Sequence, residues 1–96
     1  MDNKDLEFIK TVIRKYLNNS ENSVFIFGSR AIGNYKKYSD YDIGIEGKKL
    51  DLLKQSYIEE EFENSNFPYT VDIVDFNQVT DRFRNIAKTK IIPIKY

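Results

Sequence analysis

An alternating segment at residues 40–46 places the strongest constraint on the fold of this chain. It reads Asp40-Tyr41-Asp42-Ile43-Gly44-Ile45-Glu46. Successive side chains of a β-strand point to opposite faces of the sheet, so a period of two separates the apolar positions from the others. We therefore expect a strand whose apolar face packs on a core and whose other face carries two neighbouring carboxylates.

The paired carboxylates of this strand indicate a cation site. In an extended chain Asp40 and Asp42 lie about 6.5 Å apart. Aspartate is disfavoured in strands and two like charges repel, so a cation between them removes a local cost. Magnesium suits the position because it binds oxygen ligands, keeps several waters and is usually completed by substrate phosphates. The simpler interpretation is a half-exposed strand whose polar face is acidic.

Composition narrows the chemistry. The chain contains no cysteine and no histidine, which excludes thiolate and imidazole ligands and leaves oxygen to hold any metal. Lysine plus arginine and aspartate plus glutamate balance at 15 each, so we expect no general nucleic-acid binding. No apolar run approaches the roughly 18 residues of a membrane span, and a cytoplasmic location is the expectation.

The remaining patterns predict a single domain of residues 1–96 in the α/β (α+β) class, because a chain of this length fits one compact unit. Apolar spacing predicts helices at about residues 2–18, 49–63 and 79–87, and β-branched and aromatic runs predict strands at 23–27, 41–45 and 69–74. Residues 91–94 form either a short edge strand or an extended cover. Helices between successive strands indicate a small sheet of three or more strands flanked by helices.

A third carboxylate interrupts the apolar run of the third predicted strand. Asp72 shares a strand face with Val74, whereas Asp75 points the other way. If the second and third strands are neighbours, Asp72 faces Asp40 and Asp42 across about 5 Å, which gives the three carboxylates that a pair of metals requires. A register slip of one residue favours Asp75 instead.

The turn after the first predicted strand supplies a second feature. Gly28 lets a phosphate approach the backbone, and the following turn directs amide groups and the Ser29 hydroxyl at it. A glycine and a serine at this place are also an ordinary exit from a strand. The interpretation as a phosphate cradle therefore depends on the paired aspartates nearby.

Taken together, these segments resemble the signature of the polymerase β-like nucleotidyltransferase superfamily, and in particular its minimal nucleotidyltransferases. The resemblance rests on Gly28-Ser29-Arg30-Ala31-Ile32-Gly33, on Ser39-Asp40-Tyr41-Asp42-Ile43-Gly44-Ile45 and on Val71-Asp72-Ile73-Val74. It covers nearly the full chain. It implies a three-stranded mixed sheet flanked by helices, a magnesium-dependent transfer of AMP or another nucleoside monophosphate, and ATP, the family default, or a related triphosphate as the substrate.

The same resemblance implies roles for individual residues. Asp40 and Asp42 would bind two magnesium ions, with Asp72 as the third catalytic carboxylate and metal ligand, and Gly28 and Ser29 would contact the triphosphate. Basic residues that neutralise phosphate charge would be Arg30 and, with an equal claim to being solvated, Lys36 and Lys37. Ser39 either bonds a phosphate or caps the entry to the strand.

The resemblance also implies a partner. Larger relatives carry an additional helical domain for the acceptor, whereas minimal members act with an all-helical HEPN-type protein as antitoxin and toxin, and adenylylate a tyrosine of that partner. Three classes of function stay open at this point. They are a nucleotidyltransferase that acts on a HEPN toxin or on a small molecule of the aminoglycoside type, a non-catalytic module that binds the nucleotide or blocks the partner sterically, and a plain scaffold.

Overall fold

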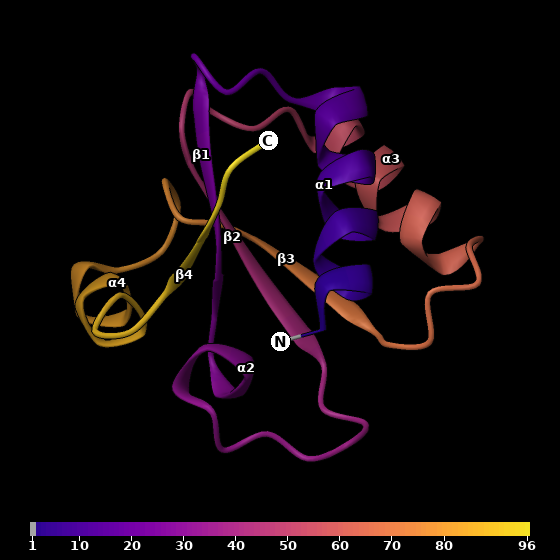
Figure 1. Ribbon diagram of the computed structural model, residues 1–96. Helices are drawn as coiled ribbons and strands as arrows, with labels where there is room; N and C mark the ends of the chain where they lie inside the picture. Colours follow the sequence, from indigo (N-terminus) through magenta and orange to yellow (C-terminus); the bar gives the residue numbers. More distant parts are fainter. Residues whose placement is uncertain (1) are drawn as a thin grey trace.

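Four strands form one mixed sheet with helices on both faces. The computed structural model describes residues 2–96. Its elements are α1 (Asn3–Tyr16), β1 (Asn22–Phe27), α2 (Ser29–Ile32), β2 (Tyr41–Gly47), α3 (Leu52–Glu63), β3 (Val71–Asp75), α4 (Asp81–Ala87) and β4 (Ile92–Ile94). The strand order is β3-β2-β1-β4, with β2 and β3 parallel and the other pairs antiparallel. Figure 1 shows α1 and α3 on one side of the sheet and α4 on the other.

The last strand settles an alternative that the sequence left open. Ile92 and Ile94 of β4 pair with Ile26 and Val24 of β1, so residues 91–94 include an edge strand rather than an extended cover. The predicted mixed sheet flanked by helices is confirmed, with four strands where the resemblance implied three.

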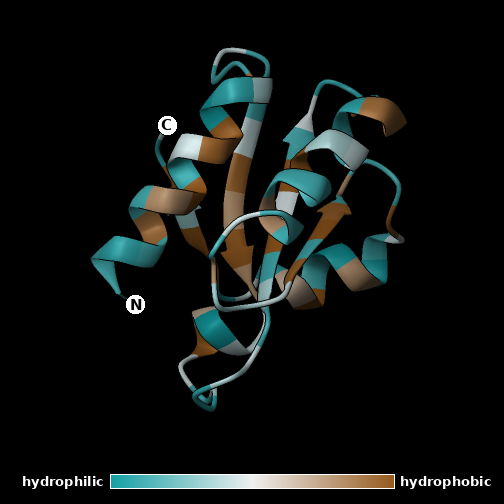
Figure 2. Cartoon of the chain, turned by 90° about the vertical axis from the view of Figure 1, so that its right-hand side faces the viewer, coloured by the Kyte–Doolittle hydropathy of each residue, from teal (hydrophilic) through white to brown (hydrophobic). Residues whose placement is uncertain are grey.

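The main core lies between the sheet and the pair α1 and α3. Tyr41, Ile43 and Ile45 of β2 are completely buried there, which confirms the apolar face of the alternating segment. The helices contribute Ile9, Val12, Ile13, Ile58 and Phe62. Full burial of one such aliphatic or phenyl side chain is worth about 1.5–3 kcal/mol, so this face drives folding. Figure 2 shows the central strands as largely hydrophobic between helices that are mostly hydrophilic.

A smaller aromatic cluster covers part of the other face of the sheet, beside α4. The ring of Phe76 lies 4.8 Å from that of Phe25 and 5.0 Å from that of Phe27. A Cβ atom at Gly44 would come within 2.4 Å of the Phe25 ring, so this glycine lets the cluster reach the backbone of β2. Asp42 lies on this same face of the sheet, because it shares the parity of Gly44, and it is paired with Phe27 of the cluster.

Side-chain caps fix where the two long helices begin. Asp2 accepts a hydrogen bond from the Lys4 amide at 2.8 Å, and Asp51 accepts one from the Leu53 amide at the same distance. A cap of this kind stabilises a helix by about 1 kcal/mol. Because Asp51 is the cap, α3 begins at Leu52, three residues later than residue 49 as predicted.

Some residues that the sequence predicted on buried helix faces are exposed. Leu53 and Tyr57 lie on the outer side of α3, because they are displaced by roughly 100° or more around the helix from the buried Ile58. On α4 the side chains of Phe83 and Ile86 are 42% and 63% exposed.

The longest helix has 14 residues, and no helix within residues 2–96 has the length and apolar character needed to cross a membrane.

Candidate active site

The end of the sheet where β1 stops and β2 and β3 start brings the predicted site residues together. Asp42 of β2 is paired with Phe27, the last residue of β1, on one side and with Asp72 of β3 on the other. Adjacent strands are about 4.8 Å apart, so the two carboxylates are direct cross-strand neighbours. Because both residues share the parity of Gly44, they emerge on the α4 side of the sheet, opposite the main core.

Gly28 approaches the Asp42 carboxylate closely. Its φ of 73° and ψ of −154° place it in a region that is essentially restricted to glycine. A Cβ atom on Gly28 would lie 2.3 Å from Oδ2 of Asp42. The backbone of this turn therefore packs directly on a carboxylate, and any side chain at position 28 would displace it.

The carboxylates interact unfavourably with one another. Burial raises the pKa of the Asp42 carboxyl, and the carboxylates of Asp72 and Asp40 raise it further. Asp42 is half-buried, whereas Asp40 and Asp72 are exposed. The charged form of Asp42 is thus disfavoured by burial and by two other carboxylates, and a bound cation would remove that cost.

The donor set fits magnesium. Carboxylates offer only oxygen, which is the ligand type that this ion takes, and magnesium is usually held by one or two carboxylates together with substrate phosphates and waters. Within the described residues 2–96, no three acidic side chains are already gathered around one point as a finished metal cage. Asp40, Asp42 and Asp72 therefore offer the oxygen ligands that magnesium takes, without forming a complete cage by themselves.

The short helix α2 follows the glycine turn directly. The amides of Ala31 and Ile32 both donate to the Gly28 carbonyl at 3.0 Å, which closes the first turn of α2. The amides of Ser29 and Arg30 come before that bonded turn, and amides at this position of a helix have no partner within the helix itself. Ser29 is half-buried at the same end of the sheet as the carboxylates, and the sequence predicted it as a phosphate contact.

Arg30 does not extend toward the carboxylates. Its side chain is 7% exposed, and its guanidinium carbon lies 4.4 Å from the ring centroids of Tyr35 and Tyr41 and 4.6 Å from that of Tyr69. Tyr41 belongs to the core face of β2, which is opposite to the face of Asp42. The structure therefore places the Arg30 guanidinium on the core side of β2, where it contacts the Ser39 carbonyl but lies on the face opposite to the Asp42 carboxylate.

Ser39 takes part in the loop that precedes β2. Its hydroxyl oxygen accepts a hydrogen bond from the Lys36 amide at 2.9 Å, and its own amide donates to the Lys36 carbonyl at 3.0 Å. These two bonds favour the capping role over the phosphate contact that the sequence offered as its alternative. Lys36 and Lys37 are exposed in the same loop.

Register decides between Asp72 and Asp75. Asp75 is paired with Ile45, at the end of β3 away from Gly28. Its carboxylate accepts hydrogen bonds from the Asn77 amide at 3.0 Å and from the Gln78 side chain at 3.3 Å. Asp75 therefore caps the turn after β3, and Asp72 is the carboxylate that lies beside Asp42.

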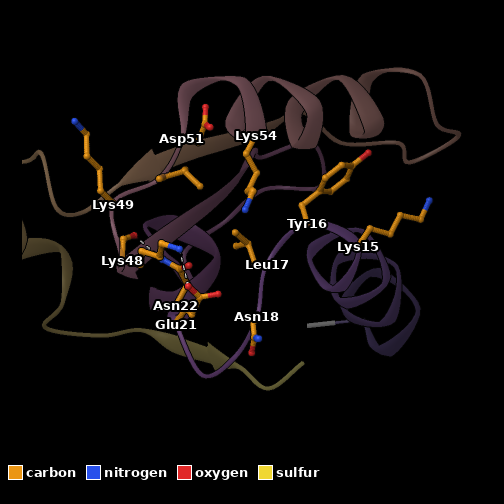
Figure 3. A pocket seen from close by; sticks show the side chains of 11 residues that line it. Lys15, Tyr16, Leu17, Asn18, Glu21, Asn22, Lys48, Lys49, Asp51 and Lys54 are labelled. Atoms are coloured by element: carbon orange, nitrogen blue, oxygen red, sulfur yellow. Dashed lines mark hydrogen bonds and ion pairs between the residues drawn. The ribbon is translucent and has the colours of Figure 1, made fainter.

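A polar hollow lies at the opposite end of the sheet. It has a volume of about 400 Å³ and includes lysines from α1, from the connection after β2 and from α3. Figure 3 shows Lys15, Lys48, Lys49 and Lys54 around it. Lys48 is paired with Glu21 at 2.8 Å, and the buried Asn22 donates to the Lys48 carbonyl at 2.8 Å. This hollow shares no residue with the carboxylate end.

Comparison with known proteins places the chain among nucleotide-transfer enzymes. Residues 7–94 match the family described as Polymerase beta, Nucleotidyltransferase. The probable protein adenylyltransferase MntA of Haemophilus influenzae is 32% identical over 93 residues, which span 96% of this chain and 80% of the relative.

Two solved complexes share the fold. A toxin–antitoxin crystal structure with AMP-PNP matches with a TM-score of 0.76 and 20% identity, over 94% of this chain and 72% of that one. A tri-AMPylated Shewanella oneidensis HEPN toxin in complex with an MNT antitoxin matches with a TM-score of 0.72 and 19% identity, over 99% of this chain and 72% of that one.

Proposed function

We propose that this chain, which belongs to the polymerase β nucleotidyltransferase family, transfers AMP from ATP to a hydroxyl group of a HEPN-type partner protein. The family supplies the reaction class. The Haemophilus influenzae relative is named as a probable protein adenylyltransferase, which favours AMP as the group and a protein as the acceptor. The Shewanella oneidensis toxin is AMPylated in its complex with an MNT antitoxin, which favours a HEPN toxin as that protein and an antitoxin role for this chain.

One observation carries the proposal. Asp42 lies in direct cross-strand register with Asp72 on one side, and on the other side the Gly28 backbone packs against its carboxylate. This arrangement supports a metal site and a phosphate-binding turn on adjacent strands. A triphosphate that bridges the two would contact the turn with its phosphates and the carboxylates through its cations.

We propose different roles for the carboxylates and for the glycine turn. Asp40, Asp42 and Asp72 are proposed to hold two magnesium ions, which, when bound, neutralise phosphate charge and lower the pKa of an acceptor hydroxyl. The backbone at Gly28 and the Ser29 hydroxyl are proposed to bind and orient the triphosphate by hydrogen bonds. Correct orientation is a large part of phosphoryl-transfer catalysis, because the attacking and leaving oxygens must lie in line.

The proposed reaction is a single displacement at the α-phosphorus. The acceptor oxygen, which we propose to be that of a tyrosine side chain, forms a bond to this phosphorus while the bond to the bridging oxygen of the β-phosphate breaks. Pyrophosphate leaves with that oxygen. The exposed carboxylate of Asp72 is proposed to take the hydroxyl proton. ATP is a cytoplasmic substrate, so we place the reaction in that compartment.

A labelling experiment tests the function. The protein is incubated with magnesium, ATP radiolabelled at the α-phosphate and the purified HEPN-type product of the adjacent reading frame. The proposal expects label on that partner, and it expects Asp40→Asn and Asp42→Asn to abolish the labelling. Label on the partner that survives both substitutions would remove these carboxylates from the mechanism.

A binding measurement separates the other classes of function. Ligand at 100 times its dissociation constant stabilises a protein by about 2.7 kcal/mol, so ATP with magnesium should raise the melting temperature. A shift without label transfer to any acceptor hydroxyl would favour the non-catalytic module. The absence of both shift and label would favour a scaffold.

A further inference from the structure

Arg30 is a buried cation without an acidic partner in the described part of the chain. It is 7% exposed, and the ion pairs found within residues 2–96 all use other basic residues. Burial of an unpaired charge is costly unless other groups compensate it. The groups around this guanidinium therefore indicate what the residue does.

Three aromatic rings surround the guanidinium. Tyr35 comes from the loop after α2, Tyr41 from the start of β2 and Tyr69 from the segment before β3, all with centroids within 4.6 Å of its carbon. Aromatic faces attract such a cation. The Tyr41 ring is itself fixed, because it is completely buried and its hydroxyl donates to Oδ2 of Asp5 in α1 at 2.8 Å.

The same guanidinium binds the backbone next to a predicted metal ligand. Nη2 and Nε of Arg30 donate to the Ser39 carbonyl at 2.8 and 3.2 Å. Ser39 is followed directly by Asp40. The other hydrogen bonds of Ser39, both with Lys36, join it only to the exposed loop of residues 33–38 and do not connect it to the rest of the fold.

Asp40 needs such a connection more than its neighbours do. Asp42 and Asp72 are held by the ladder between β2 and β3, which starts with the bond from the Tyr41 amide to the Thr70 carbonyl at 3.0 Å. Asp40 precedes that ladder and is exposed. The Asp40 and Asp42 carboxylates repel each other, so an unrestrained Asp40 backbone would let them move apart.

We propose that Arg30 is a positioning residue, which holds the Ser39–Asp40 backbone in place so that Asp40 faces Asp42 and Asp72 before any cation binds. The inference rests on the proposed function in one respect, which is the role of Asp40 as a metal ligand. A lysine cannot replace the arginine in this role, because a guanidinium presents several donors in a rigid fork and stacks flat on aromatic rings, whereas an ammonium is a compact, strongly hydrated point charge.

Backbone relaxation measured without metal or nucleotide tests the restraint. In Arg30→Lys and Arg30→Met, NMR order parameters of the Ser39 and Asp40 amides should fall from about 0.85, typical of rigid backbone, to below about 0.6, typical of flexible backbone. The amides of Tyr41 and Asp72 should keep their values. Arg82→Lys, at an exposed position of α4, is the matched control and should change none of them.

Two results would overturn the inference at this stage. One is an Asp40 amide as rigid in both variants as in the unmodified protein. The other is equal loosening of the Tyr41 and Asp72 amides in the conservative lysine variant, which would make Arg30 a general packing residue.

The magnesium dependence of nucleotide binding supplies the second readout. The magnesium concentration that half-saturates ATP binding, followed by calorimetry, should rise roughly 10–100-fold in Arg30→Lys, as for other residues that orient a metal ligand. At saturating magnesium, ATP affinity should return close to that of the Arg82→Lys control. An unchanged magnesium requirement would contradict the proposal.

The two proposals fail separately. If the unmodified protein labels no partner, the proposed function fails, while the order parameters still decide the role of Arg30. If labelling succeeds and Asp40 stays rigid in both Arg30 variants, only the positioning role is wrong.

Discussion

Tyr41 and Asp42 are adjacent in β2 and show two different outcomes of burial. Burial and the hydrogen bond to Asp5 raise the pKa of Tyr41, which stabilises the neutral form that the side chain has in any case. Burial and the carboxylates of Asp72 and Asp40 raise the pKa of Asp42, which opposes its charged form. The core face of the strand is satisfied by folding alone, whereas the other face retains a cost that a ligand can remove.

This difference separates residues that stabilise the fold from residues that are kept for function. The Tyr41 hydroxyl has its partner at 2.8 Å, and no buried side-chain oxygen or nitrogen within residues 2–96 lacks one. Asp42 has two other acidic groups beside it instead. Substitutions on the two faces should therefore move stability and activity in different directions.

Asp42→Asn should give the largest effect. It removes a proposed metal ligand, and because bound metals contribute several kcal/mol of transition-state stabilisation, AMP transfer should fall roughly a thousandfold or more. The free energy of unfolding measured in urea without metal should instead increase, because a repelled charge is removed. Activity close to that of the unmodified protein would contradict the assignment of Asp42.

Gly28→Ala should impair folding and nucleotide binding together. The backbone conformation at this position costs about 1–3 kcal/mol for a residue with a side chain, and the new Cβ atom would lie against Oδ2 of Asp42. A double-mutant cycle with Asp42→Ala isolates the contact, because the smaller residue leaves room for the methyl group. The cost of Gly28→Ala should be smaller in that background, and an equal cost would place the whole effect in backbone strain.

Tyr41→Phe, on the opposite face of β2, should lower stability more than activity. It keeps the ring beside Arg30 and removes only the hydroxyl that donates to Asp5, which leaves a buried acceptor unsatisfied at a cost of about 1–3 kcal/mol. Urea unfolding should show this loss, while AMP transfer at saturating magnesium and ATP should change little. A large loss of transfer with unchanged stability would break the distinction between the two faces.

The pH dependence of stability should show the smallest effect. The pKa of Asp42 is raised in the folded state, so between its unfolded and folded pKa values the folded chain binds more protons than the unfolded chain. Stability must then fall as pH rises through that window and stay lower above it. Denaturant titrations of the unmodified protein and of Asp42→Asn at a series of acidic pH values should differ by this component, which should disappear in the variant.

The period-two pattern of residues 40–46 was sufficient to predict both faces of β2, because alternation is a local property of a strand. The neighbourhood of Asp42 and Asp72 required the parallel register of β2 and β3, which depends on packing, and so Asp75 stayed an alternative until the structure was known. The direction of the Asp72 side chain then followed from parity alone.

The surroundings of Arg30 could not be predicted in the same way. Its place after Gly28 and Ser29 suggested a phosphate contact, but Tyr35, Tyr41 and Tyr69 come from three separate segments that meet only in the folded chain. The exposed apolar residues of α4 were misjudged for a related reason. Helical spacing predicts which residues of a helix share one face, but it does not predict how much of that face the rest of the protein covers.

A crystal structure with magnesium and a non-hydrolysable ATP analogue would test the central claim most directly. The account predicts metal density bound by oxygens of Asp40, Asp42 and Asp72, with the triphosphate on the backbone at Gly28 and Ser29. Nucleotide bound instead in the lysine-lined hollow of Figure 3, with the three carboxylates free of metal, would contradict it.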